Sequence, residues 1–73
     1  MEIFHMRESE DHIKLGQALK AAGLVESGAE AKQAVQEGSV TVNGEIDTRR
    51  GRKLHDGDLI EYSGKKIRIA AEK

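Results

Sequence analysis

The segment from residue 38 to residue 53, GSVTVNGEIDTRRGRK, constrains the fold most because it joins a tight turn to a dense basic loop. In its first half, β-branched residues flank the pair Asn43-Gly44, and both members of that pair tolerate the positive φ of a type I′ turn. The segment therefore predicts a β-hairpin. Strand alternation predicts that Val40, Val42 and Ile46 share one face of this hairpin.

The basic loop, residues 49–53, carries four cations in five positions. They are Arg49, Arg50, Arg52 and Lys53. Gly51 lies between them and allows the backbone to bend, so that several cationic side chains can converge on one anion. An arginine side chain can bind an oxyanion through two hydrogen bonds. The loop therefore predicts contacts with phosphate, and the alternative is a solvated charged loop.

Two helices are predicted before the hairpin. An apolar stripe with helical spacing predicts a first helix that has Gly16 as its N-cap and ends at Gly23. Ser27 and Glu30 predict a capping box at the start of a second helix, and Gly38 predicts its end. The two stripes are Leu15, Ala18, Leu19 and Ala22, and then Ala31, Ala34 and Val35.

Further strands are predicted in residues 1–6, 59–62 and 66–69, and the last two are joined by a turn at Ser63-Gly64. The chain has 73 residues, no proline and no linker, so residues 1–73 are expected to form one domain. The predicted fold class is α+β. Two short packed helices lie against a small, mainly antiparallel sheet of four or five strands.

Composition excludes several classes of function. The chain has no cysteine and no metal-ligand spacing among its three histidines, so we expect no metal and no cofactor. No nucleophile, base and orienting group can be assembled from the sequence, so we expect no enzymatic activity. No apolar run approaches the roughly 18 residues of a membrane span, and a cytoplasmic protein without membrane contact is expected.

The formal net charge of −1 is distributed unevenly. Residues 1–48 carry four basic and nine acidic groups, whereas residues 49–73 carry eight basic and four acidic groups. This asymmetry predicts a local basic surface, typical of proteins that bind a polyanion.

The order of these elements resembles the S-four RNA-binding domain, also called the alpha-L motif, over residues 13–62. The resemblance is carried by SGAEA at residues 27–31, GSVTVNG at residues 38–44 and GDLI at residues 57–60. It implies a small free-standing bacterial protein that binds structured RNA, either ribosomal or transfer RNA, and that associates with ribosomal particles. We expect it to act as a monomer.

The resemblance adds Lys14 and Lys32 to the predicted RNA contacts, and both could equally be ordinary exposed lysines. Asn43 is a further candidate, although the turn alone explains an asparagine there. Family members often have a basic residue in place of Gly28 and an aspartate in place of Gly16. We expect Lys32 and the basic loop to supply the charge that is missing at Gly28.

Two questions stay open from the sequence. The cations Lys65, Lys66 and Arg68 could extend the basic surface or balance nearby acidic residues. The alternative function is that of a protein–protein adaptor that docks an acidic partner in ribosome-related assembly. Only Phe4 and Tyr62 are aromatic, so RNA recognition is expected to depend on phosphate contacts and RNA shape rather than on stacking.

Overall fold

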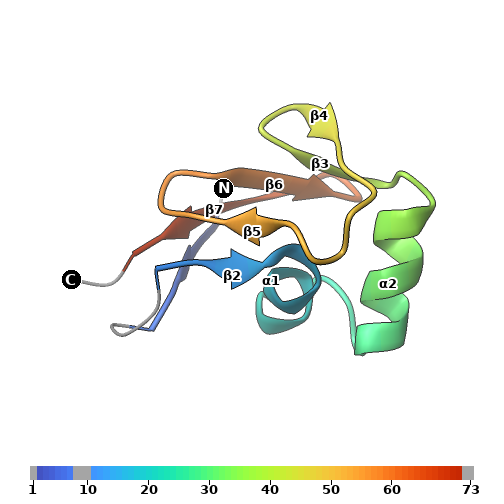
Figure 1. Cartoon of the computed structure of the whole chain (residues 1–73), viewed down its shortest axis with the longest axis horizontal. Coiled ribbons are helices and arrows are strands. Elements are labelled where there is room, and N and C mark those ends of the chain that lie inside the picture. The colour runs from blue at the N-terminus through green and yellow to red at the C-terminus, as the bar shows by residue number, and fades with distance from the viewer. Residues whose placement is uncertain (1, 8–10, 72–73) are drawn as a thin grey trace.

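The protein is described by a computed structural model that covers residues 2–7 and 11–71 (Figure 1). The helices are α1 (Leu15–Ala21) and α2 (Gly28–Gln36). The strands are β1 (Glu2–His5), β2 (Ile13–Lys14), β3 (Val40–Val42), β4 (Glu45–Ile46), β5 (Lys53–Leu54), β6 (Leu59–Tyr62) and β7 (Lys65–Ala70). Within these two described ranges, no helix is long and apolar enough to cross a membrane.

Among the residues that the structure describes, five strands form the main sheet in the order β1-β7-β6-β3-β4, and β2 and β5 form a separate two-stranded ladder. Three of the four ladders in the main sheet are antiparallel, and β1 runs parallel to β7. The predicted α+β fold with a mainly antiparallel sheet is therefore confirmed. The strand expected in residues 1–6 is β1, and residue 1 lies outside the described residues.

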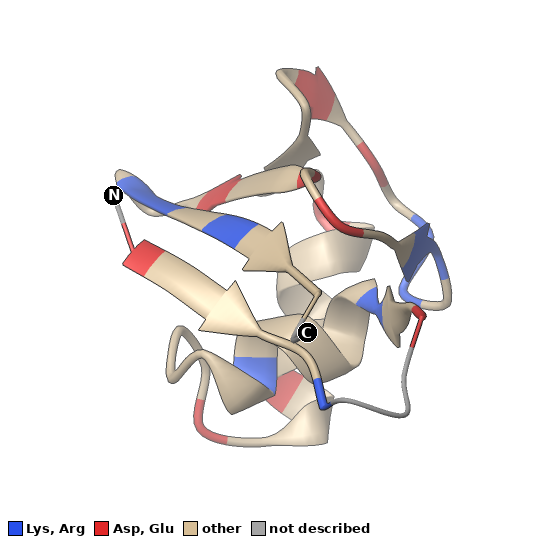
Figure 2. Cartoon of the chain, turned by 90° about the vertical axis from the view of Figure 1, so that its left-hand side faces the viewer, with Lys and Arg blue, Asp and Glu red and all other residues tan. Residues whose placement is uncertain are grey.

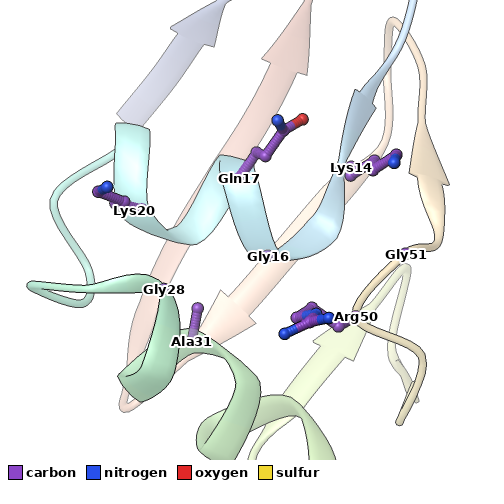
Figure 3. A pocket seen from close by; sticks show the side chains of 8 residues that line it. All are labelled: Lys14, Gly16, Gln17, Lys20, Gly28, Ala31, Arg50 and Gly51. Atoms are coloured by element: carbon purple, nitrogen blue, oxygen red, sulfur yellow. The ribbon is translucent and has the colours of Figure 1, made fainter.

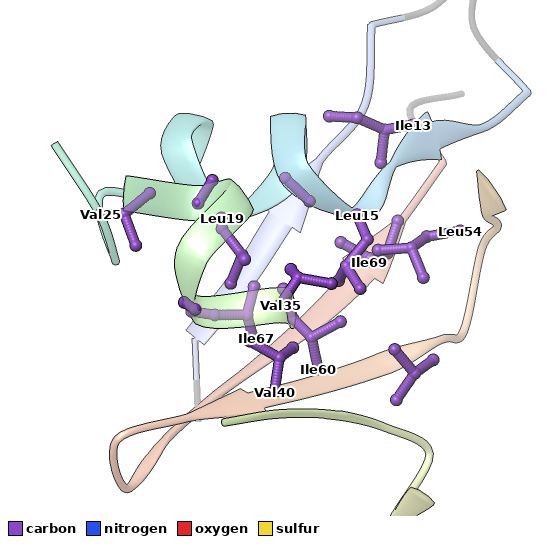
Figure 4. Packing of buried hydrophobic residues seen from close by; sticks show 14 of the residues in the cluster. Ile13, Leu15, Leu19, Val25, Val35, Val40, Leu54, Ile60, Ile67 and Ile69 are labelled. Atoms are coloured by element: carbon purple, nitrogen blue, oxygen red, sulfur yellow. The ribbon is translucent and has the colours of Figure 1, made fainter. Parts of the chain in front are cut away.

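The core lies between the two helices and one face of the sheet (Figure 4). Both predicted helical stripes contribute to it, although Ala22 is only partly buried. From the sheet, alternate residues of β7 point inward, and Ile67 and Ile69 are buried while Lys66 and Arg68 are exposed. The helices therefore cover only one face of the sheet.

The start of α2 follows the prediction in part. The Ser27 hydroxyl accepts a hydrogen bond from the backbone N–H of Glu30 at 3.2 Å. The Glu30 carboxylate accepts from the backbone N–H of Glu26 at 2.6 Å, so it reaches one residue before the cap rather than Ser27 itself. After α2, Gly38 has a φ of +79°, which confirms the predicted left-handed stop.

The start of α1 corrects the sequence prediction. Gly16 is not the N-cap: the cap is Lys14, and Gly16 is buried in the first turn. No side chain in the described part of the chain caps this helix. Instead, backbone carbonyls of the basic loop accept from its first amides, Leu15 N–H to Arg52 O at 2.8 Å and Gly16 N–H to Arg50 O at 3.0 Å. The loop thus takes the place of a capping side chain and is fixed against α1.

The hairpin forms as predicted, with φ values of +53° at Asn43 and +86° at Gly44. The prediction for Ile46 is wrong. A two-residue turn places Val42 opposite Glu45, so Ile46 lies opposite Thr41, on the other face from Val40 and Val42. The side chain of Ile46 consequently points away from the core, and the residue is 66% exposed.

Candidate nucleic-acid interface

The basic loop is organised around a buried carboxylate, that of Asp47. Asp47 Oδ1 accepts from the backbone N–H of Arg49 at 2.8 Å and from its Nε at 3.2 Å. Asp47 Oδ2 accepts from Arg49 Nη2 at 3.0 Å and from Arg52 Nη1 at 2.7 Å. These hydrogen bonds outweigh the effect of burial and hold the pKa of Asp47 well below its usual range. One carboxylate therefore pairs with two arginines and neutralises at most one of their two charges.

The third arginine of the loop lies elsewhere. Arg50 extends between α1 and α2, where it lines an open pocket of about 390 Å³ (Figure 3). The other cations of the pocket are Lys14, at the start of α1, and Lys20, in its last turn. The rest of the lining consists of Gln17 and small residues, namely Gly16, Gly28, Ala31 and Gly51. Three cations thus line a pocket whose other lining residues, apart from Gln17, have little or no side chain.

The pocket cations have no acidic partner within the described residues. Between two described residues, the ion pairs that join Lys or Arg to an acidic group are those of Arg49 and Arg52, both with Asp47. Lys53 lies beside the pocket, because it is the cross-strand partner of Lys14 in the β2–β5 ladder. The arrangement can bind an anion without first breaking an internal ion pair.

A family model described as the S4 domain matches residues 6–70. The chain belongs to the S4 domain family. One relative of this S4 domain is the "Probable ribosome maturation protein RlbA" of Bacillus subtilis, 52% identical over 52 residues, which are 71% of this chain and 73% of that protein. Another is the "Putative RNA-binding protein YbcJ" of Escherichia coli, 38% identical over 60 residues, 82% of this chain and 86% of that protein.

The fold of this S4 domain also matches a solved structure. The solution structure of YbcJ from Escherichia coli, described as revealing an alfaL motif involved in RNA binding, superposes with a TM-score of 0.74 and 35% sequence identity. The match covers 97% of this chain and 89% of that one. The predicted resemblance to the family is therefore confirmed.

The predicted contacts of the S4 domain are not all brought together. Lys14 and Arg50 line the pocket, whereas Lys32 is exposed on α2, one helical turn beyond Gly28. Both polar atoms of the Asn43 side chain are hydrogen-bonded within the protein. Its Nδ2 donates to Asp58 Oδ1 at 3.1 Å, and its Oδ1 accepts from the Leu59 N–H at 2.9 Å. This pairing favours a structural role for Asn43.

Two residues that shape the interface, Lys20 and Asp47, were not among the site residues predicted from the sequence. Lys20 could have been found from helical spacing, because it follows Gly16 by four residues and Gln17 by three and so shares their face. Asp47 gave no such signal. Only the folded loop shows that its carboxylate accepts hydrogen bonds from both Arg49 and Arg52.

The cations of β7 belong to another surface. Lys66 and Arg68 alternate with the buried Ile67 and Ile69, so they lie on the face of the sheet that the helices leave uncovered. Figure 2 shows the basic bands of β7 well apart from those of the basic loop. Lys66 is also the cross-strand partner of Glu61, which partly balances its charge. These residues do not extend the pocket.

Two histidines that are far apart in the sequence lie close in the fold. The rings of His12 and His55 have centroids 6.2 Å apart, next to the β2–β5 ladder. His12 Nδ1 lies 2.8 Å from Asp11 Oδ1. Within residues 2–7 and 11–71, no group of three or more histidine, aspartate or glutamate side chains could hold a metal ion.

Proposed function

We propose that this S4 domain protein binds structured RNA without catalysing a reaction, and that Lys14, Lys20 and Arg50 are its principal contacts. The observation that carries the proposal is the pocket that these three cations line together, Lys14 from the start of α1, Lys20 from its last turn and Arg50 from the basic loop. The small residues that line the pocket also support this proposal, because glycine and alanine allow an RNA backbone to approach the protein closely. Lys53 and Lys32 extend the contact at its edges.

The hydrogen bonds within the loop indicate which of its arginines is available to bind phosphate. The hydrogen bonds of Arg49 and Arg52 to Asp47 would have to be weakened before either side chain could bind phosphate fully. Arg50 makes no such bond to a described residue, so its guanidinium is available to an oxyanion. We therefore assign Arg50 to phosphate binding and Arg49 and Arg52 mainly to the structure of the loop.

The names of two relatives support ribosomal RNA as the ligand. One relative is named for RNA binding and the other for ribosome maturation. We propose that the protein acts in the cytoplasm as a monomer on ribosomal particles or their RNA. Since the interface is cationic and lacks aromatic residues, affinity is expected to fall steeply with salt and to depend weakly on sequence.

The test compares binding of a structured ribosomal RNA fragment, a DNA duplex and a single-stranded RNA over a range of salt concentrations. The variants are Arg50→Glu and, as a matched control with the same charge change on the uncovered face of the sheet, Arg68→Glu. If four phosphates are engaged, the slope of log affinity against log salt is roughly −3. Arg50→Glu is expected to weaken RNA binding strongly, and Arg68→Glu only slightly.

Equal binding by wild type and Arg50→Glu would refute the proposed interface. Absence of RNA binding in all three proteins, together with retention of an acidic protein partner that Arg50→Glu loses, would favour the adaptor function instead. Tighter binding of the DNA duplex than of the RNA fragment would contradict the proposed ligand class.

A further inference from the structure

Gly16 and Arg50 are in close contact on one side of the pocket. The Gly16 N–H donates to the Arg50 carbonyl at 3.0 Å. A Cβ atom placed on Gly16 would lie 2.7 Å from Arg50 Cγ and 3.3 Å from Arg50 Cδ. The Arg50 side chain therefore occupies the space that any other residue at position 16 would fill. Figure 3 shows Arg50 beside the first turn of α1.

Helix propensity alone does not favour a glycine here. Gly16 lies inside the first turn of α1, where its φ is not in the left-handed region that favours glycine. Alanine would ordinarily stabilise a helix at such a position. The contact with Arg50 supplies a physical reason for glycine, because only a residue without Cβ leaves room for the arginine stem.

We infer that Gly16 is a positioning residue for RNA binding, which it assists by letting Arg50 lie across the first turn of α1 with its guanidinium held between the two helices. This inference rests on the proposed function of the pocket. The inference also explains how the pocket has a cation near Gly28, although Gly28 has no charged side chain. Arg50 of the basic loop lines the same pocket and supplies that charge. A side chain at position 16 would force Arg50 to another rotamer.

The test is a double-mutant cycle of Gly16→Ala and Arg50→Ala, with RNA affinity as the readout. Arg50→Ala is expected to weaken binding about 10-fold, as for loss of one charge-assisted contact. Gly16→Ala should weaken binding about 3-fold or more, because Arg50 must then be ordered on binding. In the Arg50→Ala background, Gly16→Ala should have no effect, since the new Cβ no longer meets a Cγ.

The control is Arg68→Ala. It makes the same change as Arg50→Ala but lies on the uncovered face of the sheet, so RNA affinity should change little. Thermal unfolding of each variant separates displacement of Arg50 from loss of the fold, and Gly16→Ala is expected to unfold at or above the wild-type temperature. The salt slope provides a second readout. It should become shallower by about 0.7 to 0.9 in Arg50→Ala, which loses a phosphate contact, and stay near the wild-type value in Gly16→Ala, in which Arg50 still reaches the phosphate once it is ordered.

The outcomes distinguish this inference from the proposed function. If Arg50→Ala weakens RNA binding and Gly16→Ala does not, the positioning role is overturned while the function stands. If Gly16→Ala weakens binding equally with and without Arg50, the effect does not pass through the arginine and the inference is again overturned. If Arg50→Ala itself has no effect, the proposed interface fails first.

Discussion

Replacement of Asp47 by asparagine tests how the basic loop is held together. Asp47 is only 5% exposed, and its two oxygens accept from the Arg49 backbone N–H and from the guanidinium groups of Arg49 and Arg52. The Arg49 side chain is 72% exposed and should contribute little, whereas that of Arg52 is 30% exposed. Asparagine keeps one acceptor oxygen, which can serve the backbone N–H of Arg49, and loses the charge and the second acceptor.

The expected loss in the free energy of unfolding at neutral pH is about 2 kcal/mol, the size of one hydrogen bond between charged groups plus weakening of another. The difference should depend on pH. Because the pKa of Asp47 is lower in the folded than in the unfolded protein, its stabilisation is present above the unfolded-state value and is lost as the pH falls towards the folded-state value. Wild type and Asp47→Asn should therefore converge in stability as the pH drops below about 4.

The assay is urea unfolding at neutral and acidic pH, with Asp56→Asn as the matched control. Asp56 is exposed and accepts one backbone hydrogen bond, from Ala71 at 2.9 Å, which asparagine can retain. The control should differ from wild type by about 0.5 kcal/mol or less. A loss for Asp47→Asn no larger than that of the control, or a loss that is the same at both pH values, would refute this account of the loop.

Three further predictions concern the fold. Ser27→Ala removes the hydroxyl that caps α2 and should destabilise the protein by about 1 kcal/mol in urea unfolding, and an unchanged midpoint would contradict the capping role. Asn43→Gly keeps the positive φ but loses the hydrogen bonds to Asp58 and Leu59, so it should lower the free energy of unfolding by about 1 kcal/mol and leave RNA affinity unchanged. Reduced RNA affinity in a folded variant would show that Asn43 contacts the RNA. Val42→Thr buries a hydroxyl and should cost about 1 to 3 kcal/mol, whereas Ile46→Thr should cost about 0.5 kcal/mol or less, and similar losses would contradict the observed hairpin register.

Local patterns were sufficient to predict most of the fold. The Asn-Gly turn, the Ser27 cap and the stop at Gly38 depend on the conformation of a few adjacent residues, and the structure confirms each of them. Ile46 was placed on the wrong face because alternation was continued through a turn, whereas the two turn residues shift the pairing. Gly16 was taken for a cap because the carbonyls that meet the first amides of α1 come from the distant basic loop.

The candidate site depended more on tertiary contacts. A cluster of like charges in the sequence identified the basic loop but could not show that Asp47 would pair with two of its arginines. Nor could it show that Arg50 would lie against α1 and line the same pocket as Lys14 and Lys20. Which cations remain available to a ligand is decided by pairings between segments, and these appear only in the folded chain.

The proposed RNA-binding site is the pocket between α1, α2 and the basic loop. Its location can be tested by titrating isotopically labelled protein with a structured ribosomal RNA fragment and following the backbone amide signals in NMR spectra. Glycine amides make this sensitive, because Gly16, Gly28 and Gly51 all line the pocket, whereas Gly64 lies at the turn between β6 and β7. If RNA binds at the pocket, the signals of the three pocket glycines shift first and that of Gly64 shifts least. Early shifts at Gly64 and along β7, with the pocket glycines unmoved, would contradict this location.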